Sequence, residues 1–359
     1  MKRLLVYGNG SFDLKGRSRD GSVYTRRGLI KWCNENSIQF VWLGKYKDEE
    51  IDDLIQTIEI ADVIGDKKGP YELNDDLPKG DFLLVEGRTR VFGPFDAGYD
   101  QGKVLEWYCK NTNIKIGIWD FDLNIYNILG KKGKVGLYPW ISEYLNRFVG
   151  FIPYELTETI LSKHNLQEFK TMYWPINTET LKPIEKDREI DLLYNGSDYN
   201  RRAKFKEFYG DISEQTDLIV KFSGVWKKKD SQEFLSQFPK LQHTGYVKLN
   251  ELQDLIRNSL AVIQIVRKDY EPLGYHTERM QEVPFFGTVC LGDRQIKNIE
   301  KFCPEDLIVY TTSEAIEKLK WLKSLSYEEY SEVVEMQRKH LLNNHNTYVT
   351  GYKQLLEYI

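Results

Sequence analysis

Apolar segments alternate with amphipathic segments along the first half of the chain. Short apolar runs favour strands, and longer stretches with helical spacing favour helices. In chain order these segments are RLLVYG, YTRRGLIKWCNEN, IQFVWLG, DFLLVEG, GKVLEWYCKN and IKIGIWD. Because the short runs are apolar throughout rather than alternating, we expect a parallel sheet covered by helices on both faces.

A second series of the same kind follows a polar connection. Residues 173–190 carry Pro175 and Pro183 in a charged setting, which is typical of a link between domains. The segments beyond it are IDLLYNG, NRRAKFKEFYG, LIVKFSG, HTGYV, KLNELQDLIRNS, LAVIQIV, TERMQEVPFFG, TVCLG and DLIVYT. The sequence therefore predicts an α/β chain with two Rossmann-like domains facing each other across a cleft, with nucleotides at the carboxyl ends of strands.

These patterns also predict the domain boundaries. We expect an N-terminal domain over residues 1–176 and a C-terminal domain over residues 186–341. The remaining tail has helical spacing, and we expect its helix, about residues 342–359, to return to the N-terminal domain.

Composition indicates a globular protein of the cytoplasm. Hydrophobic residues make up 41% of the chain and charged residues 29%, and no apolar run approaches the ~18 residues of a membrane span. The start, MKRLLVYGNGSF, is too short in its apolar run for a signal peptide and is expected to be a first buried strand. The four cysteines are scattered, without zinc or disulfide spacing, which favours a reducing compartment.

Basic residues gather locally although the net charge is −4. A glycine-containing segment near the N-terminus is rich in them, as are three later segments. Such clusters contact phosphates if they face one cleft, and are solvated loops otherwise. The clusters comprise Lys15, Arg17, Arg19, Arg26, Arg27 and Lys31; Arg88 and Arg90; Lys131, Lys132 and Lys134; and Lys227, Lys228 and Lys229.

Two aspartates end the predicted strand IKIGIWD. Asp120 and Asp122 stand at a strand end, where catalytic groups of α/β proteins gather. A carboxylate there can act as a general base toward a hydroxyl. Two alternatives are a helix-capping or loop-binding role for Asp120, and a metal-binding D-x-D motif, which requires a different architecture.

The second domain offers candidate nucleotide ligands. Gly196 and Ser197 form a turn before a helix that opens with Arg201 and Arg202, a pattern suited to a diphosphate. Arg279 and Glu282 lie one helical turn apart and either pair with each other or bind a diphosphate and ribose hydroxyls separately. The five histidines have no metal-like spacing; His276 lines the donor site or is structural.

In order and spacing, several segments resemble the T-even phage DNA β-glucosyltransferase family, two-domain glycosyltransferases of the GT-B fold. The matching landmarks are LLVEGRTRVFG, IKIGIWD, YWPI, DLLYNGS followed by RRAKFKEF, HTGYV and TERMQEV. The resemblance spans nearly the whole chain. It implies that the N-terminal domain binds the DNA acceptor, that the basic clusters contact this DNA, and that the C-terminal domain binds a UDP-sugar.

The resemblance also implies roles for single residues. Asp120 becomes the catalytic base, Arg201 and Arg279 contact the diphosphate, and Glu282 binds the ribose. The turn formed by Gly245, Tyr246 and Val247 holds the uracil. The chain departs from the family in two places. A second phosphate arginine of the family falls on residues 198–200, and an acidic residue that helps to hold the sugar falls near residues 22 and 23.

The implied activity is inverting transfer of a sugar to a hydroxymethylated pyrimidine that is flipped out of double-stranded phage DNA. The first acceptor to expect is 5-hydroxymethylcytosine. UDP-glucose is the first donor to expect, and the departures are compatible with a UDP-pentose such as UDP-arabinose. The implied protein is a monomer in the host cytoplasm, without a membrane partner. It requires no structural metal, although Mg²⁺ or Mn²⁺ could assist the release of UDP.

Two other function classes fit the same patterns. A GT-B glycosyltransferase acting on a polysaccharide, lipid or protein would share the second domain's motifs without needing a basic N-terminal loop. A nucleotide- or DNA-binding module could keep the fold without the chemistry.

Overall fold

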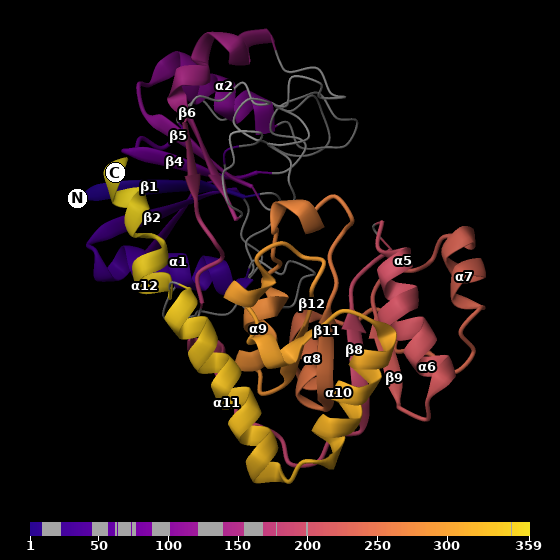
Figure 1. Ribbon diagram of the computed structural model, residues 1–359. Coiled ribbons are helices and arrows are strands. Elements are labelled where there is room, and N and C mark those ends of the chain that lie inside the picture. The colour runs from indigo at the N-terminus through magenta and orange to yellow at the C-terminus, as the bar shows by residue number, and fades with distance from the viewer. Residues whose placement is uncertain are drawn as a thin grey trace. The chain divides into compact units, whose positions relative to one another are not determined.

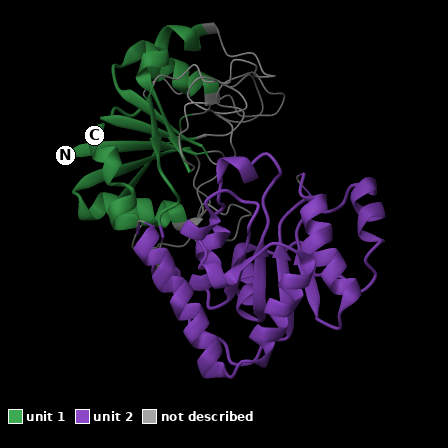
Figure 2. Cartoon of the chain, viewed as in Figure 1, with its two compact units in different colours: residues 1–15, 22–175, 348–359 green, residues 16–21, 176–347 purple. Residues whose placement is uncertain are grey.

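The chain folds into two α/β units (Figure 2). The computed structural model describes residues 1–8, 23–44, 57–61, 63, 73, 77–87, 101–120, 139–153, 168–176, 178–198, 200–345 and 347–359. Unit 1 takes its described residues from 1–175 and 348–359, and unit 2 takes its described residues from 176–347.

Unit 1 is built on a parallel seven-stranded sheet with the strand order β3-β2-β1-β4-β5-β6-β7 (Figure 1). The strands are β1 (Lys2–Tyr7), β2 (Ile38–Leu43), β3 (Ile58–Ala61), β4 (Phe82–Gly87), β5 (Lys115–Asp120), β6 (Phe148–Ile152) and β7 (Glu168–Thr171). The helices between them are α1 (Val23–Glu35), α2 (Gln101–Asn111) and the 3₁₀ helix η3 (Pro139–Arg147). The order reverses between β1 and β4, which is the switch point where α/β sheets bind ligands.

Unit 2 repeats this topology with the order β10-β9-β8-β11-β12-β13, again parallel, so its switch point lies between β8 and β11. Its strands are β8 (Ile190–Asn195), β9 (Val220–Ser223), β10 (Gln242–His243), β11 (Ser259–Gln264), β12 (Val289–Asp293) and β13 (Ile308–Val309). Its main helices are α5 (Arg202–Phe205), continued by η5 (Lys206–Gly210) and α6 (Asp211–Gln215), then α7 (Lys229–Leu235), α8 (Leu249–Arg257), α9 (Arg279–Phe285), α10 (Thr312–Ser324) and α11 (Tyr327–Asn344). Two parallel α/β domains, as predicted, are confirmed.

The last twelve residues belong to unit 1, which confirms the predicted return of the C-terminus. The segment consists of α12 (Tyr348–Gly351) and the 3₁₀ helix η9 (Lys353–Glu357). The Tyr352 ring is buried against Trp32 and Trp119, and its hydroxyl donates to the Thr25 carbonyl at 2.9 Å. Lys2 Nζ donates to the Ile359 carbonyl at 2.6 Å, so the two termini lie side by side (Figure 1).

Local sequence explains the long helices of unit 2. Ser326 caps α11 by accepting a hydrogen bond from the Glu329 amide, while the Glu329 side chain accepts from the Ser326 amide. From α11, Gln337 exchanges hydrogen bonds with the Cys290 backbone, which fixes the helix on β12. All four cysteines are free and buried. Among the described residues, no helix is long and apolar enough to cross a membrane.

Candidate nucleotide and acceptor sites

Two arginines stand after the two strands that flank the switch point of unit 2. Arg201 follows β8 as the N-cap of α5, and Arg279 is the first residue of α9, after β11. Because these strands are neighbours in a parallel sheet, their carboxyl ends bring both arginines to the same edge. Burial is the main cause that lowers the pKa of Arg279, and the charge of Arg201 lowers it further. The charge of Arg201 therefore acts on Arg279.

Two buried donors at this edge of the sheet have no partner among the described residues. The Nε atom of Arg201 is buried and has no hydrogen-bond partner in the part of the chain that the structure describes. The nearby hydroxyl of Tyr194, one residue before the end of β8, is also buried and lacks a partner among the described residues. Two neighbouring cations, with a guanidinium N–H and a hydroxyl that donate to no described residue, suit an anion with several oxygens.

Glu282 does not pair with this pair of cations. It lies one turn after Arg279 on α9, yet no ion pair joins the two side chains, both of which are described. Burial raises the pKa of the Glu282 carboxyl, and the charge of Arg279 opposes the rise. The Oε1 atom is buried and accepts no hydrogen bond from the described residues. The mutual surface pair considered from the sequence is therefore absent, and Glu282 is left as an acceptor for donors such as hydroxyls.

The loop after β8 is packed closely against the loop after β9. Gly224 has φ of +144°, and a Cβ there would lie 2.0 Å from the Gly196 carbonyl oxygen. The Gly196 amide donates to the Ser223 carbonyl at 2.9 Å, and Trp226 Nε1 donates to the Gly196 carbonyl at 2.8 Å. The expectation that the Gly196 amide binds a diphosphate is therefore wrong for this conformation, because the sheet already uses that donor. Gly196 serves instead to let the two loops approach.

The predicted uracil-binding turn follows β10 at the same edge of the sheet. Gly245 adopts the left-handed region with φ of +80°, and its carbonyl accepts from the Gly224 amide at 3.1 Å. No atom lies within 4 Å of the position of a Cβ on Gly245. Tyr246 is 37% exposed and Val247 is half-buried. The structure thus places Gly245, Tyr246 and Val247 beside the loop of Gly196 and Ser197.

His276 has a packing role among the described residues. Its ring is buried and lies on the ring of Phe302 with centroids 3.5 Å apart. Burial lowers the pKa of His276 far below its usual value, so the imidazole is neutral. The structural interpretation of this histidine fits these contacts.

Asp120 lies at the carboxyl edge of the sheet in unit 1. It is the last residue of β5, it is fully buried, and its backbone is in register with Gly87 at the end of β4. The residue before Gly87 is Glu86, so two carboxylates end neighbouring strands next to the switch point. Asp122 lies outside the described residues.

Arg26 is the clearest correction to the predicted DNA-binding set. It lies on α1 and forms a two-pronged ion pair with Glu86, in which Nε donates to Oε1 at 2.6 Å and Nη2 donates to Oε2 at 2.5 Å. Both side chains are only 2% exposed, and the guanidinium lies over the ring of Trp42. An arginine so buried and so paired is not available to a phosphate backbone. Sequence reasoning passed over Glu86, whose only signal was a carboxylate ending an apolar strand.

The other predicted DNA contacts differ in exposure, and several lie outside the described residues. Arg27 and Lys31 are half-buried on α1, and Lys227, Lys228 and Lys229 are exposed after β9. The remaining predicted contacts lie outside the described residues. These are Lys15, Arg17, Arg19, Arg88, Arg90, Lys131, Lys132 and Lys134.

No cluster of three or more His, Cys, Asp or Glu side chains with metal-binding geometry occurs within the described ranges. The residues placed at the nucleotide site are mainly cationic and hydroxyl donors, which suit an anion rather than a metal ion.

Comparison with known proteins identifies the fold. No protein-family model matches the chain, and no curated protein matches it in sequence. Solved structures match along the full length. The crystal structure of the DNA-modifying enzyme β-glucosyltransferase, in the presence and absence of UDP-glucose, is 16% identical with a TM-score of 0.69 and covers 100% of this chain and 99% of that chain.

Two further structures are similar to this chain. T4 phage BGT in complex with its UDP-glucose substrate is 16% identical with a TM-score of 0.67, over 100% of this chain and 99% of that chain. An α-glucosyltransferase in complex with UDP and a 13-mer DNA containing an HMU base is 12% identical with a TM-score of 0.67, over 99% and 98%. The fold expected from the resemblance, GT-B, is thereby confirmed.

Proposed function

We propose that the chain is an inverting glycosyltransferase that moves a sugar from a UDP-sugar to 5-hydroxymethylcytosine in double-stranded DNA. The observation that carries the proposal is that Arg201 and Arg279 both follow neighbouring strands at the switch point of unit 2, and that the buried Nε of Arg201 has no acceptor among the described residues. The full-length likeness to DNA-modifying glucosyltransferases supports the choice of acceptor.

The arrangement of unit 2 supports a donor site at its switch point. Arg201 and Arg279 bind the diphosphate, whose negative charge grows as the bond to the sugar breaks. Glu282 accepts hydrogen bonds from the ribose hydroxyls with its Oε1 atom, which accepts none from the described residues. The turn of residues 245–247 contacts the uracil. UDP-glucose and UDP-pentoses are the donors to compare, and a divalent ion bound at the diphosphate would add charge neutralisation.

Asp120 acts as the general base in unit 1. Its carboxylate takes the proton of the hydroxymethyl group, and the resulting oxygen attacks the anomeric carbon on the face opposite UDP. The bond from carbon to the diphosphate oxygen breaks as the new bond forms, so one displacement inverts the configuration and gives a β-linkage. Because the acceptor must leave the helix to reach a buried carboxylate, the base is flipped out of the duplex.

An Asp120→Asn variant tests this mechanism. We expect it to abolish sugar transfer to hydroxymethylated DNA while its affinity for UDP stays within about twofold of the parent, because the base and the nucleotide site belong to different units. Retention of most transfer activity would assign the base to another residue. Transfer to a polysaccharide, lipid or protein with DNA binding absent would favour the alternative acceptor class.

A further inference from the structure

A buried carboxylate fixes the loop that carries Arg201. Asp198 is the third residue after β8, and its side chain is 9% exposed. It accepts hydrogen bonds from Arg202 Nε at 2.8 Å and from Ser231 Oγ at 2.7 Å, and it also contacts Arg202 Nη2. Ser231 is a buried residue of α7. The carboxylate therefore joins the loop after β8 to the start of one helix and to a second helix.

The Nε and Nη2 atoms of Arg202 are engaged by these and further contacts. Its Nη2 atom also donates to Asp230 Oδ2 at 2.9 Å, and the guanidinium lies over the ring of Phe234. Hydrogen bonds to Asp198 and Asp230 raise the pKa of Arg202. An arginine held by two carboxylates has little charge left for a ligand.

Arg201, the preceding residue, lacks such contacts at its Nε atom. Its Nε atom has no hydrogen-bond partner among the described residues, although it is buried. Consecutive residues at the start of a helix point in different directions. Because Arg202 turns toward Asp198 and Ser231, Arg201 turns elsewhere, at the edge of the sheet where Arg279 also begins its helix.

The backbone between Asp198 and Arg201 has an uncommon conformation that the contacts of Asp198 help to hold. Asn200 has φ of +51°, a left-handed conformation that is uncommon outside glycine. A residue in this region persists where its surroundings hold it. On the other side of the loop, Trp226 holds the Gly196 carbonyl, so side chains fix both ends of the turn.

We propose that Asp198, together with Ser231, is a positioning residue that holds Arg202 and thereby aims Arg201 at the diphosphate of the nucleotide-sugar donor. The proposal rests on the proposed function, because it assigns the anion at Arg201 to that donor. It also gives a role to Asp198, which lies at the position where the resemblance predicts a second phosphate arginine.

The test compares two ligands by isothermal titration calorimetry. Asp198→Ala should weaken UDP binding about tenfold, the scale of one charge-assisted hydrogen bond, and leave uridine binding unchanged, because uridine has no diphosphate. Ser231→Ala should act in the same direction with a smaller loss. Arg201→Ala and the double variant Asp198→Ala with Arg201→Ala should lose equal UDP affinity, because Asp198 acts only through Arg201.

Asp211→Ala is the matched control, since it removes a carboxylate that pairs with Lys206 farther along the same helical segment. It should bind UDP and uridine as the parent does. Unchanged UDP binding in Asp198→Ala and Ser231→Ala, or equal losses for UDP and uridine, would overturn the positioning role. Failure of the parent to bind UDP would instead refute the donor site itself. Should Asp198→Ala not fold, Ser231→Ala alone decides between these outcomes.

Discussion

Removing Glu86 should destabilise unit 1 strongly, because it leaves the buried Arg26 without its carboxylate. Both side chains are 2% exposed and two hydrogen bonds of 2.6 and 2.5 Å join them. Breaking a buried ion pair from one side costs about 3–5 kcal/mol. For a domain of this size, that loss corresponds to a fall in Tm of about 6–20 °C.

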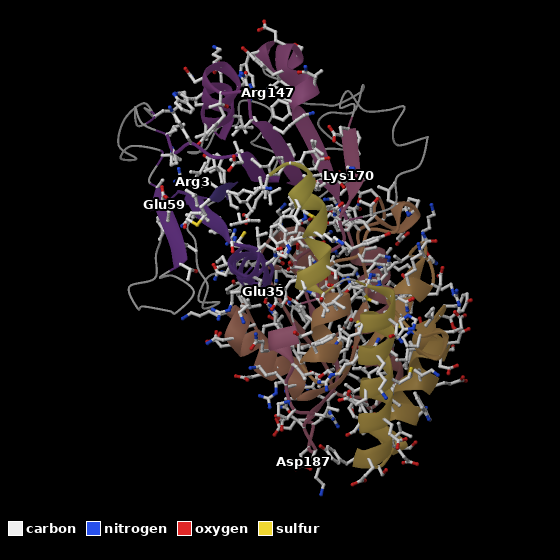
Figure 3. The ribbon with its side chains drawn as sticks, turned by 90° about the vertical axis from the view of Figure 1, so that its left-hand side faces the viewer. Arg3, Glu35, Glu59, Arg147, Lys170 and Asp187 are labelled. Carbon is white, nitrogen blue, oxygen red and sulfur yellow. The ribbon has the colours of Figure 1, made fainter. Side chains whose placement is uncertain are left out.

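Thermal and urea unfolding followed by circular dichroism measure this loss for Glu86→Ala. The matched control is Glu59→Ala, since Glu59 pairs with Arg3 at 2.6 Å but the side chains are 45% and 30% exposed (Figure 3). An exposed pair contributes about 0–1 kcal/mol, so the control should unfold close to the parent. The reasoning is refuted if Glu86→Ala and Glu59→Ala lose equal stability.

The same pair tests the correction to the DNA-binding set. Replacing both partners by apolar residues, Arg26→Met with Glu86→Leu, should be close to neutral for stability. It should also leave the salt dependence of DNA binding unchanged, whereas loss of a phosphate contact lowers the slope of log K against log salt by about 1. A lowered slope in a folded double variant would return Arg26 to the DNA interface.

Three further outcomes follow from the donor site. Arg279→Met should raise Tm in the absence of ligand, because it removes a desolvated cation, and should weaken UDP binding about 10–100-fold by calorimetry. The pKa of the Glu282 carboxyl is raised in the folded protein. Its contribution to stability therefore falls as pH rises from the usual carboxyl range through that raised pKa. The Tm advantage of Glu282→Gln over the parent should grow from about pH 5 to about pH 8. Gly224→Ala places a Cβ 2.0 Å from the Gly196 carbonyl at positive φ and should cost at least about 2 kcal/mol in urea unfolding.

The fold was accessible from the sequence because each strand carries its own signal. Runs such as RLLVYG and IDLLYNG are apolar on both faces, and strands of that kind occur in parallel sheets covered by helices. The glycine at 287 likewise predicted the end of the helix that begins at Arg279, where φ is +95°. These features depend on neighbours within a few residues, which a single sequence contains.

The partners of charged residues were not accessible in the same way. Arg26 looked like one of several basic residues in a polar loop, but its carboxylate lies 60 positions later on β4. Arg201 and Arg202 look alike in sequence, and Asp198, Ser231 and Asp230 decide which of them is free for a ligand. The Gly196 amide was expected to bind phosphate, but pairing of β8 with β9 gives it to Ser223. The contacts of Arg26 and of the Gly196 amide form only when segments far apart in the chain come together.

The catalytic assignment combines both kinds of information. The strand-end position of Asp120 came from the pattern, and the structure places it in register with Gly87, next to Glu86. Its role as base was taken from the resemblance. The assignment of Asp120 therefore remains a prediction for enzymology.

Mass spectrometry of 5-hydroxymethylcytosine-containing duplex DNA, incubated with the protein and a panel of UDP-sugars, tests the central claim most directly. We predict a mass increase of one sugar residue on the modified cytosine with UDP-glucose or a UDP-pentose, in the parent but not in Asp120→Asn. No mass increase with any UDP-sugar, from a parent protein that binds both UDP and the DNA, would contradict it.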